Sequence, residues 1–262
     1  MERARKILVI PDSHVMPHED LRRFELLGKF ILSEEPDVIV QIGDFMTLDA
    51  FSEWDMNKRA KMEGRRYEEE IRAASTALDL IFNPMLSLRE RQKEQKRKQY
   101  SPEVFWLEGN HEDRETRYLD YHPELIGTLD YKRAIGLTDS RYPLTVVRYK
   151  EYVTIGDIGF THIPITNNNS VSIGGKNVLA KALDLHHHSV VFGHTHRLGY
   201  SSDTRHGSPR LLQALNVGCY IDVVPEYARG SLMNWWAGLV MIHQYENGPF
   251  DFETFSMNVL KG

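Results

Sequence analysis

Apolar runs that stop abruptly at Asp, Asn or His recur along this sequence. The apolar part of each run is short, as in a buried β-strand. In α/β sheets, functional sites assemble at the C-terminal ends of the strands. Several such runs in one chain therefore predict a common site at one edge of a sheet. The runs with their polar ends are Lys6–His14, Pro36–Asp44, Glu103–Glu112, Asp157–His162 and Ser189–His196.

Between these strands, apolar residues repeat every three or four positions, which is the spacing of one helical face. This pattern predicts helices over about Glu19–Ser33 and Arg65–Phe82, and we expect a third over about Lys176–Leu185. Asn83-Pro84 is expected to break or kink the second helix, because the residue before a proline avoids the helical conformation. Together with the strand-end pattern, these helices favour the α/β class.

The second half of the chain is richer in strand patterns. Residues 144–162 are typical of β-hairpins built from LTVVRY, EYVTI and IGFTH. Further strands are expected near Gly199–Thr204, Arg210–Val217 and Trp236–Gln244. The sequence has no internal repeat, low-complexity linker or convincing domain boundary. We therefore predict one domain over residues 1–262, with a helical insertion at about residues 52–100.

Composition narrows the class of protein. The chain has 262 residues, of which 41% are hydrophobic and 26% charged, as in an ordinary globular protein. Its formal net charge of −5 gives no overall nucleic-acid footprint. The single cysteine, Cys219, excludes a disulfide framework. No apolar run is long enough for a signal peptide or a membrane span, so we expect a cytoplasmic protein without a membrane partner.

One local exception to the acidic balance is Arg89–Lys98, which carries six basic and two acidic residues. The simplest interpretation is a solvated helix end or loop. The alternative is a basic arm that meets a polyanion, which keeps nucleic acid among the candidate partners.

The polar strand ends supply the ligand types that transition metals prefer. Two divalent ions about 3.5–4 Å apart can clamp a displacement at phosphorus and activate a water molecule as hydroxide. Such a pair needs a shared carboxylate and several N or O ligands. Carboxylate, amide and imidazole donors suit Mn, Fe(II) or Zn, whereas a thiolate site is excluded here. The candidate ligands are Asp12, His14, Asp44, Asn110, His162, His194 and His196.

The order of these blocks resembles one known family, the calcineurin-like metallophosphoesterases. The resemblance implies two packed mixed β-sheets flanked by helices, in a four-layer α-β-β-α sandwich. It also implies two divalent metal ions, with Mn foremost and Fe, Zn or Ni as alternatives. The blocks that carry it are Asp12-Ser13-His14, Gly43-Asp44, Gly109-Asn110-His111-Glu112, His162 and Gly193-His194-Thr195-His196.

The resemblance further implies a role for each residue. His111 would protonate or stabilise the departing oxygen while a hydroxide between the two ions attacks the phosphate. One ion would be held by Asp12, His14, Asp44 and His196, and the other by Asp44, Asn110, His162 and His194, with Asp44 bridging. Apart from the resemblance, we expect a charged helix to begin near Glu112 and Asp113, and Arg114 in it is a candidate substrate contact, against the competing interpretation of a surface charge.

The expected activity is therefore hydrolysis of a phosphomonoester or phosphodiester. A metal-dependent nuclease acting on DNA is the alternative, favoured by Arg89–Lys98 and by the long insertion. A non-catalytic interaction scaffold on the same fold is less favoured, because such a scaffold would be expected to have lost ligands or the catalytic histidine.

Overall fold

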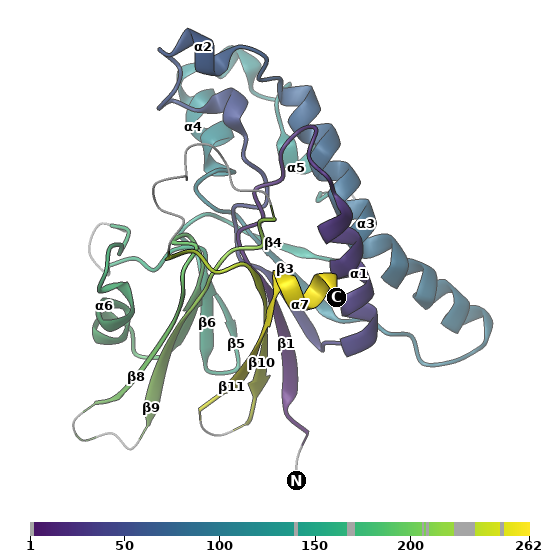
Figure 1. Cartoon of the computed structure of the whole chain (residues 1–262), viewed down its shortest axis with the longest axis vertical. Coiled ribbons are helices and arrows are strands. Elements are labelled where there is room, and N and C mark those ends of the chain that lie inside the picture. The colour runs from purple at the N-terminus through teal and green to yellow at the C-terminus, as the bar shows by residue number, and fades with distance from the viewer. Residues whose placement is uncertain are drawn as a thin grey trace.

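Two mixed β-sheets lie face to face at the centre of the computed structural model (Figure 1). The structure describes residues 3–138, 141–166, 171–205, 207, 210–222, 234–246 and 249–262. The first sheet has the order β11-β10-β1-β2-β3-β4. In it β1 to β4 run parallel, and β10 pairs antiparallel with β1 and β11. Its strands are β1 Arg5–Ile10, β2 Val38–Gln41, β3 Glu103–Leu107, β4 Thr145–Val147, β10 Gly238–Gln244 and β11 Asp251–Ser256.

The second sheet has the order β5-β6-β7-β9-β8. Its three central strands, β6, β7 and β9, run parallel, and its edge strands are antiparallel to their neighbours. The strands are β5 Val153–Ile155, β6 Ile158–Thr161, β7 Ser189–Phe192, β8 Leu198–Thr204 and β9 Leu211–Val217.

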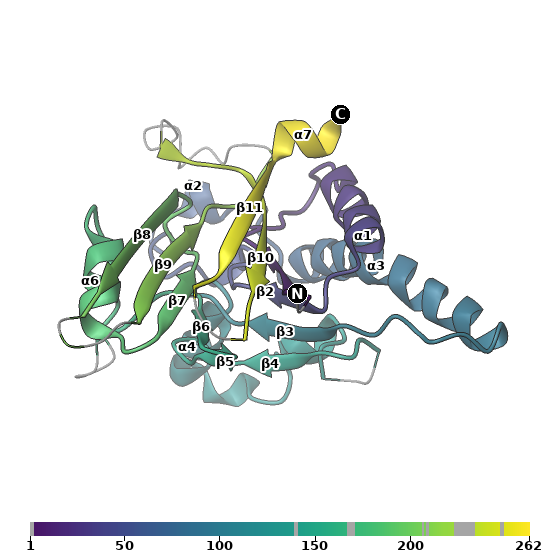
Figure 2. The ribbon, with the colours of Figure 1, turned by 90° about the horizontal axis from the view of Figure 1, so that it is seen from below.

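Helices cover the outer faces of both sheets, as the views in Figure 1 and Figure 2 show. α1 and α3 pack on each other beside the first sheet, and α6 packs on the second sheet. The predicted arrangement of two mixed sheets flanked by helices is confirmed. The helices are α1 Arg22–Glu34, α2 Arg59–Met62, α3 Tyr67–Glu94, α4 Asp113–Tyr121, α5 Tyr131–Ala134, α6 Val178–Leu185 and α7 Met257–Lys261, with short 3-10 turns η1 Asp49–Phe51 and η2 Pro123–Leu125.

The position of β1 between two cores explains why its sequence is continuously apolar. Ile7 and Val9 point into the core between the two sheets, whereas Leu8 and Ile10 point into the core beneath α1 and α3. Because side chains alternate along a strand, a strand buried on both faces needs apolar residues at every position. The polar residues that follow Ile10 therefore mark the point where the strand leaves the core.

Helix α3 continues through Pro84 to Glu94, so the predicted break at Asn83-Pro84 is wrong, and the kink given as its alternative stays a prediction. Proline leaves the carbonyl of Leu80, four residues earlier, without its helical N–H partner. Gly28 of α1 lies directly over this turn, and a Cβ there would be 2.5 Å from the Leu80 oxygen. The close packing of α1 on α3 that Gly28 permits holds the helix together across the proline.

The predicted series of hairpins over residues 144–162 is only partly right. β5 and β6 form a hairpin, but β4 pairs in parallel with β3 in the other sheet. The N–H of Glu108 bonds to the carbonyl of Val147 and extends that pairing, while Val147 packs into the core between the sheets. The chain then crosses to the second sheet through Lys150, which has a φ of +67°.

The C-terminal strand β11 and helix α7 were not anticipated, because the only apolar residues of Asp251–Ser256 are Phe252 and Phe255, which do not alternate with polar residues as in a strand pattern. The side chain of Ser256 caps the N-terminus of α7 by accepting a hydrogen bond from the N–H of Val259. Within the described residues, no helix is both long and apolar enough to cross a lipid bilayer.

The basic run Arg89–Lys98 forms the last turns of α3 and the segment after it, where most of its residues are exposed. It leads into the N-terminal end of β3 at Glu103. Asn110 and the other candidate ligands lie near the C-terminal end of the same strand. The basic run therefore lies at the opposite end of the sheet's strands.

Candidate metal centre

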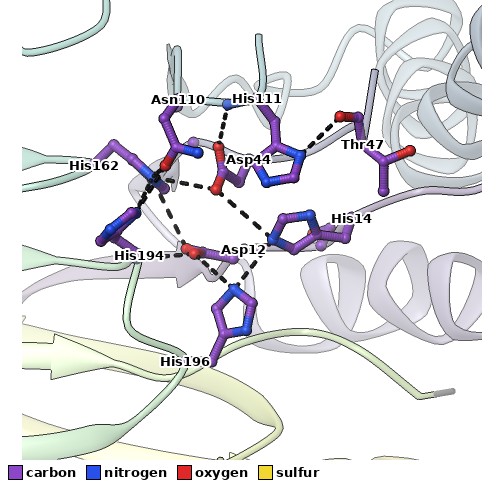
Figure 3. A network of polar contacts seen from close by, with 12 residues as sticks. Asp12, His14, Asp44, Thr47, Asn110, His111, His162, His194 and His196 are labelled. Atoms are coloured by element: carbon purple, nitrogen blue, oxygen red, sulfur yellow. Dashed lines mark hydrogen bonds and ion pairs between the residues drawn. The ribbon is translucent and has the colours of Figure 1, made fainter. Parts of the chain in front are cut away.

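The five strand ends singled out in the sequence meet at one place. β1, β2 and β3 of the first sheet and β6 and β7 of the second deliver their polar residues to the edge shared by both sheets, as Figure 3 shows. Most of these side chains are buried. The side chains brought together are Asp12, His14, Asp44, Asn110, His111, His162, His194 and His196.

One cluster is formed by Asp12, His14 and His196, whose ligand atoms all lie within 4.8 Å of one another. The Nε2 atoms of His14 and His196 are 3.1 Å apart. Nε2 of His196 is also 3.2 Å from Oδ2 of Asp12. Two imidazoles and a carboxylate thus converge on one point.

A second cluster lies beside the first and contains Asp44, His162 and His194, again with ligand atoms within 4.8 Å. Oδ1 of Asn110 is 3.0 Å from Nε2 of His162 and 2.8 Å from Nδ1 of His194. The amide of Asn110 therefore completes this group with a fourth donor atom.

Asp44 lies between the two clusters. Its Oδ2 is 3.7 Å from Nε2 of His14 in the first cluster and 3.3 Å from Nε2 of His162 in the second. The other carboxylate oxygen, Oδ1, accepts a hydrogen bond from the N–H of His111. This bond fixes the carboxylate so that one oxygen faces both clusters.

The donor set fits divalent transition metals, which favour carboxylate, amide and imidazole ligands. Oδ1 of Asp12 and Nδ1 of His14 are buried and have no hydrogen-bond partner among the described residues. Burying a polar atom without a partner is costly, so buried polar groups normally have one. A metal ion beside Asp12 would compensate its carboxylate.

Burial and neighbouring charges shift the pKa values of four candidate ligands, and they do so in different directions. Burial, reinforced by His111, lowers the pKa of His14 well below its ordinary value, so the ring is neutral, as a ligand must be. Burial also lowers the pKa of His194. Burial opposes ionisation of Asp44, but His162 and His111 hold its pKa well below the usual range. For His162, burial is outweighed by Asp44 and Asp12, which raise its pKa to about 9.

Three glycines make room for the ligands. A Cβ at Gly109 would overlap Oδ1 of Asp44, and a Cβ at Gly193 would overlap Oδ1 of Asp12. A Cβ at Gly43 would lie 2.6 Å from Nδ1 of His162. The glycine that precedes one ligand thus packs against a ligand from another strand, which explains the Gly-Asp, Gly-Asn and Gly-His pairs of the sequence.

The backbone at the site is strained at four candidate ligands. Their φ angles are 45° for His14, 50° for Asp44, 67° for His194 and 57° for His196. Left-handed backbone is unfavourable for residues with a Cβ, and such strain gathers at functional sites, where the surrounding structure enforces it. These turns aim the side chains back across the ends of the strands.

His111 and Arg114 form a pair on the outer side of the centre. Nδ1 of His111 is 2.7 Å from the carbonyl oxygen of Thr47, which can only accept, so Nδ1 carries the hydrogen. Arg114 donates 2.8 Å bonds to the same carbonyl and to Asp49, and its Nη2 is 3.3 Å from Nε2 of His111. Arg114 therefore orients His111, and its contact with a substrate remains a prediction.

Three supporting residues escaped the sequence analysis. The buried carboxylate of Glu112 accepts hydrogen bonds from the N–H groups of Asp44, Met46 and Gly109. Its place at the end of the Gly109–Glu112 block was a signal, but it was interpreted only as a helix start. Two further residues support the first cluster. Arg23 is buried against the carbonyl of Ser13, and the ring of Trp235 meets His196 edge-on with 4.2 Å between centroids.

The chain is similar to several known proteins over most of its length. The chain is 26% identical over 251 residues to the gene 54 proteins of Mycobacterium phages D29 and L5, covering 91% of this chain and 89% of each relative. Among solved structures it is similar to a dimetal phosphatase from Danio rerio, with a TM-score of 0.44 and 13% identity, over 97% of this chain and 99% of that one.

The family model described as calcineurin-like phosphoesterase matches residues 5–198, which include every candidate ligand. That family implies two divalent metal ions, and the two side-chain clusters are candidates to hold them. The chain belongs to the calcineurin-like phosphoesterases and is a metal-dependent hydrolase of phosphate esters.

Proposed function

We propose that this protein hydrolyses a phosphomonoester or phosphodiester at a pair of divalent ions bridged by Asp44. The observation that carries the proposal is the position of Asp44 Oδ2, within 3.7 Å of His14 and 3.3 Å of His162. A shared carboxylate is what holds two ions close enough to act on one phosphate. The first ion would be held by Asp12, His14, Asp44 and His196, and the second by Asp44, Asn110, His162 and His194.

When bound, the two ions would polarise the phosphoryl oxygens and supply a hydroxide nucleophile near neutral pH. Manganese is the proposed metal, because the site combines two carboxylates and an amide with four imidazoles, and Fe, Zn or Ni are the alternatives. The buried residues around the pair would exclude bulk water and hold the ligands in fixed positions.

His111 is the proposed catalytic residue. Because Nδ1 donates to Thr47, Nε2 is the ring nitrogen that can take up a proton, once it gives up its 3.3 Å contact with Nη2 of Arg114. Burial lowers the pKa of His111, and Asp44 opposes that effect. An anionic ester beside the ring would favour the protonated form. Nε2 would then give its proton to the departing oxygen.

The position of the basic run argues against the alternative that it guides DNA to the metal centre of a nuclease. The basic run Arg89–Lys98 lies at the N-terminal edge of β3, whereas the metal centre lies beyond its C-terminal end. We therefore expect reversal of charge at Lys96, Arg97 and Lys98 to leave hydrolysis of a small ester unchanged. Salt-sensitive DNA binding that is weakened in that variant would restore the nuclease interpretation.

Substitution of the bridging residue tests the proposal. Asp44→Asn keeps the shape of the side chain but removes its charge, and the matched control is Asp184→Asn on the exposed face of α6. Activity on chromogenic mono- and diesters with added Mn²⁺ is expected to fall at least about a hundredfold in Asp44→Asn only. Undiminished turnover in Asp44→Asn would refute the bridging role.

A further inference from the structure

A hollow of about 350 Å³ opens beside the second metal cluster and is not used by the chemistry described so far. Asn110, a proposed ligand of the second ion, forms part of its wall. The hollow therefore adjoins the place where the phosphate would be held. Its volume is at the lower end of the range for small-molecule sites. It is lined by Ser52, Glu53, Trp54, Asn110, Arg114 and Arg117.

Trp54 offers a flat apolar surface at this hollow. Its side chain is 85% exposed, and Lys58 approaches the ring at 5.6 Å from its centroid. This exposed ring lines the hollow and is therefore available to a planar group bound there. Planar rings such as nucleobases stack on exposed indoles with little dependence on sequence.

Arg117 carries a positive charge whose partner Glu53 could be exchanged for a ligand. Its Nη1 is 3.6 Å from Glu53, its Nε is 3.2 Å from Asp113, which would stay paired, and its side chain is 42% exposed. Exposed ion pairs of this kind contribute little, so a phosphate oxygen could replace Glu53 at low cost. Its Nη2 donates to the carbonyl of Asn110, which keeps the guanidinium beside the metal centre. Arg114 is 17% exposed and is held by Asp49.

We propose that this hollow binds the leaving nucleotide of a small nucleotide phosphodiester, with its base stacked on Trp54 and its own phosphate beside Arg117. The proposal rests on the proposed function above. Water would add its oxygen to phosphorus, the P–O bond to the nucleotide would break, and the released sugar oxygen would take up a proton. The products are a phosphomonoester and a nucleotide.

A short nucleotide fits better than a long nucleic acid. The hollow has room for about one nucleotide, and the chain carries a formal net charge of −5. The basic run that would follow a longer strand lies at the opposite edge of the first sheet. We therefore expect the protein to contact the leaving nucleotide but no further nucleotides of a longer strand.

Binding to the metal-loaded protein tests the pocket directly. The probes are adenosine 3′,5′-bisphosphate and ribose 5-phosphate, measured by calorimetry on the full chain. Trp54→Ala is expected to weaken the adenosine probe about tenfold or more and to leave the ribose probe unchanged, because only the former can stack. Trp54→Phe should retain most of the affinity. Tyr121→Ala, which removes another exposed aromatic ring on α4, is the matched control.

Kinetics on a phosphorylated dinucleotide and on glycerophosphocholine give the second readout. Trp54→Ala should raise KM for the dinucleotide about tenfold and leave both constants for the other ester unchanged. Equal effects on both esters would overturn the proposal that the hollow binds the leaving nucleotide. Equal binding of the adenosine probe by Trp54→Ala and wild type would also overturn it. Failure of the wild-type protein to hydrolyse any ester would instead overturn the proposed function, while the calorimetry would still decide the pocket.

Discussion

The backbone N–H of His111 donates a 2.8 Å hydrogen bond to Oδ1 of Asp44. This bond ties the loop after β3 to the loop after β2, and it leaves Oδ2 of Asp44 facing both clusters. The residue proposed to act on the leaving group and the residue proposed to bridge the ions are thus fixed by one contact. Distortion of either loop should affect metal binding and catalysis together.

Gly109→Ala tests this coupling. The new Cβ would overlap the backbone nitrogen and Oδ1 of Asp44, neither of which can move without breaking the bridge. We expect a loss of about 1–3 kcal/mol in the free energy of unfolding and an affinity for Mn²⁺ weaker by about 10–100-fold. Gly174→Ala is the control, because a Cβ there meets nothing within 4 Å. Equal metal affinity in the two variants would contradict this account.

Glu112 is expected to hold together the loops that follow β2 and β3. Its carboxylate accepts bonds of 2.9, 3.0 and 2.8 Å from the N–H groups of Asp44, Met46 and Gly109. Glu112→Ala would leave these donors buried without partners, at about 1–3 kcal/mol for each. Glu112→Gln keeps one acceptor oxygen and should lose less. Chemical denaturation measures both, with the exposed Glu246→Gln as control, and equal stability of all three variants would disprove the role.

The convergence of the candidate ligands could be predicted from the sequence because each follows an apolar strand. β2, for example, lies at Val38–Gln41 within the predicted run Pro36–Asp44, and Asp44 comes three residues after the strand ends. The role of Glu112 could not be predicted in the same way. Its partners are backbone groups of another loop, and a sequence pattern shows side chains but not the N–H groups that they will meet.

Long-range packing explains the remaining differences. Pro84 is a strong local signal for a break, but Gly28 on α1 allows close packing that sustains the helix. β4 looks like a hairpin strand locally, yet the free edge of β3 takes it into the first sheet. In both cases the deciding partner lies at least forty residues away, so a local pattern could not reveal it.

Arg23 is expected to stabilise the first cluster through the backbone. Its guanidinium is fully buried, bonds to the carbonyls of Ser13 and Tyr220, and pairs with Glu19 at 2.8 Å. Arg23→Leu would leave Glu19 as an uncompensated buried charge and should cost about 3 kcal/mol or more in the free energy of unfolding. Arg22→Leu, at the neighbouring exposed position, should change stability little. A similar small effect of both substitutions would count against this role.

Metal affinity should rise with pH. In the metal-free protein the pKa of His162 is about 9, above the ordinary value of 6.5, so the ring holds a proton through the neutral range. An ion must displace that proton, so apparent affinity should increase by up to about tenfold for each pH unit below 9. Calorimetry with Mn²⁺ at pH 6.5 and 8, in buffers of different ionisation enthalpy, would detect the released proton. Affinity that does not change with pH, with no proton released, would exclude this competition.

The most direct measurement of the central claim is anomalous diffraction from crystals of the protein grown with Mn²⁺. We predict two anomalous peaks about 3.5–4 Å apart, one on each side of Oδ2 of Asp44. The first should be surrounded by Asp12, His14 and His196, and the second by Asn110, His162 and His194. A single peak, or two peaks of which neither contacts Asp44, would contradict the account.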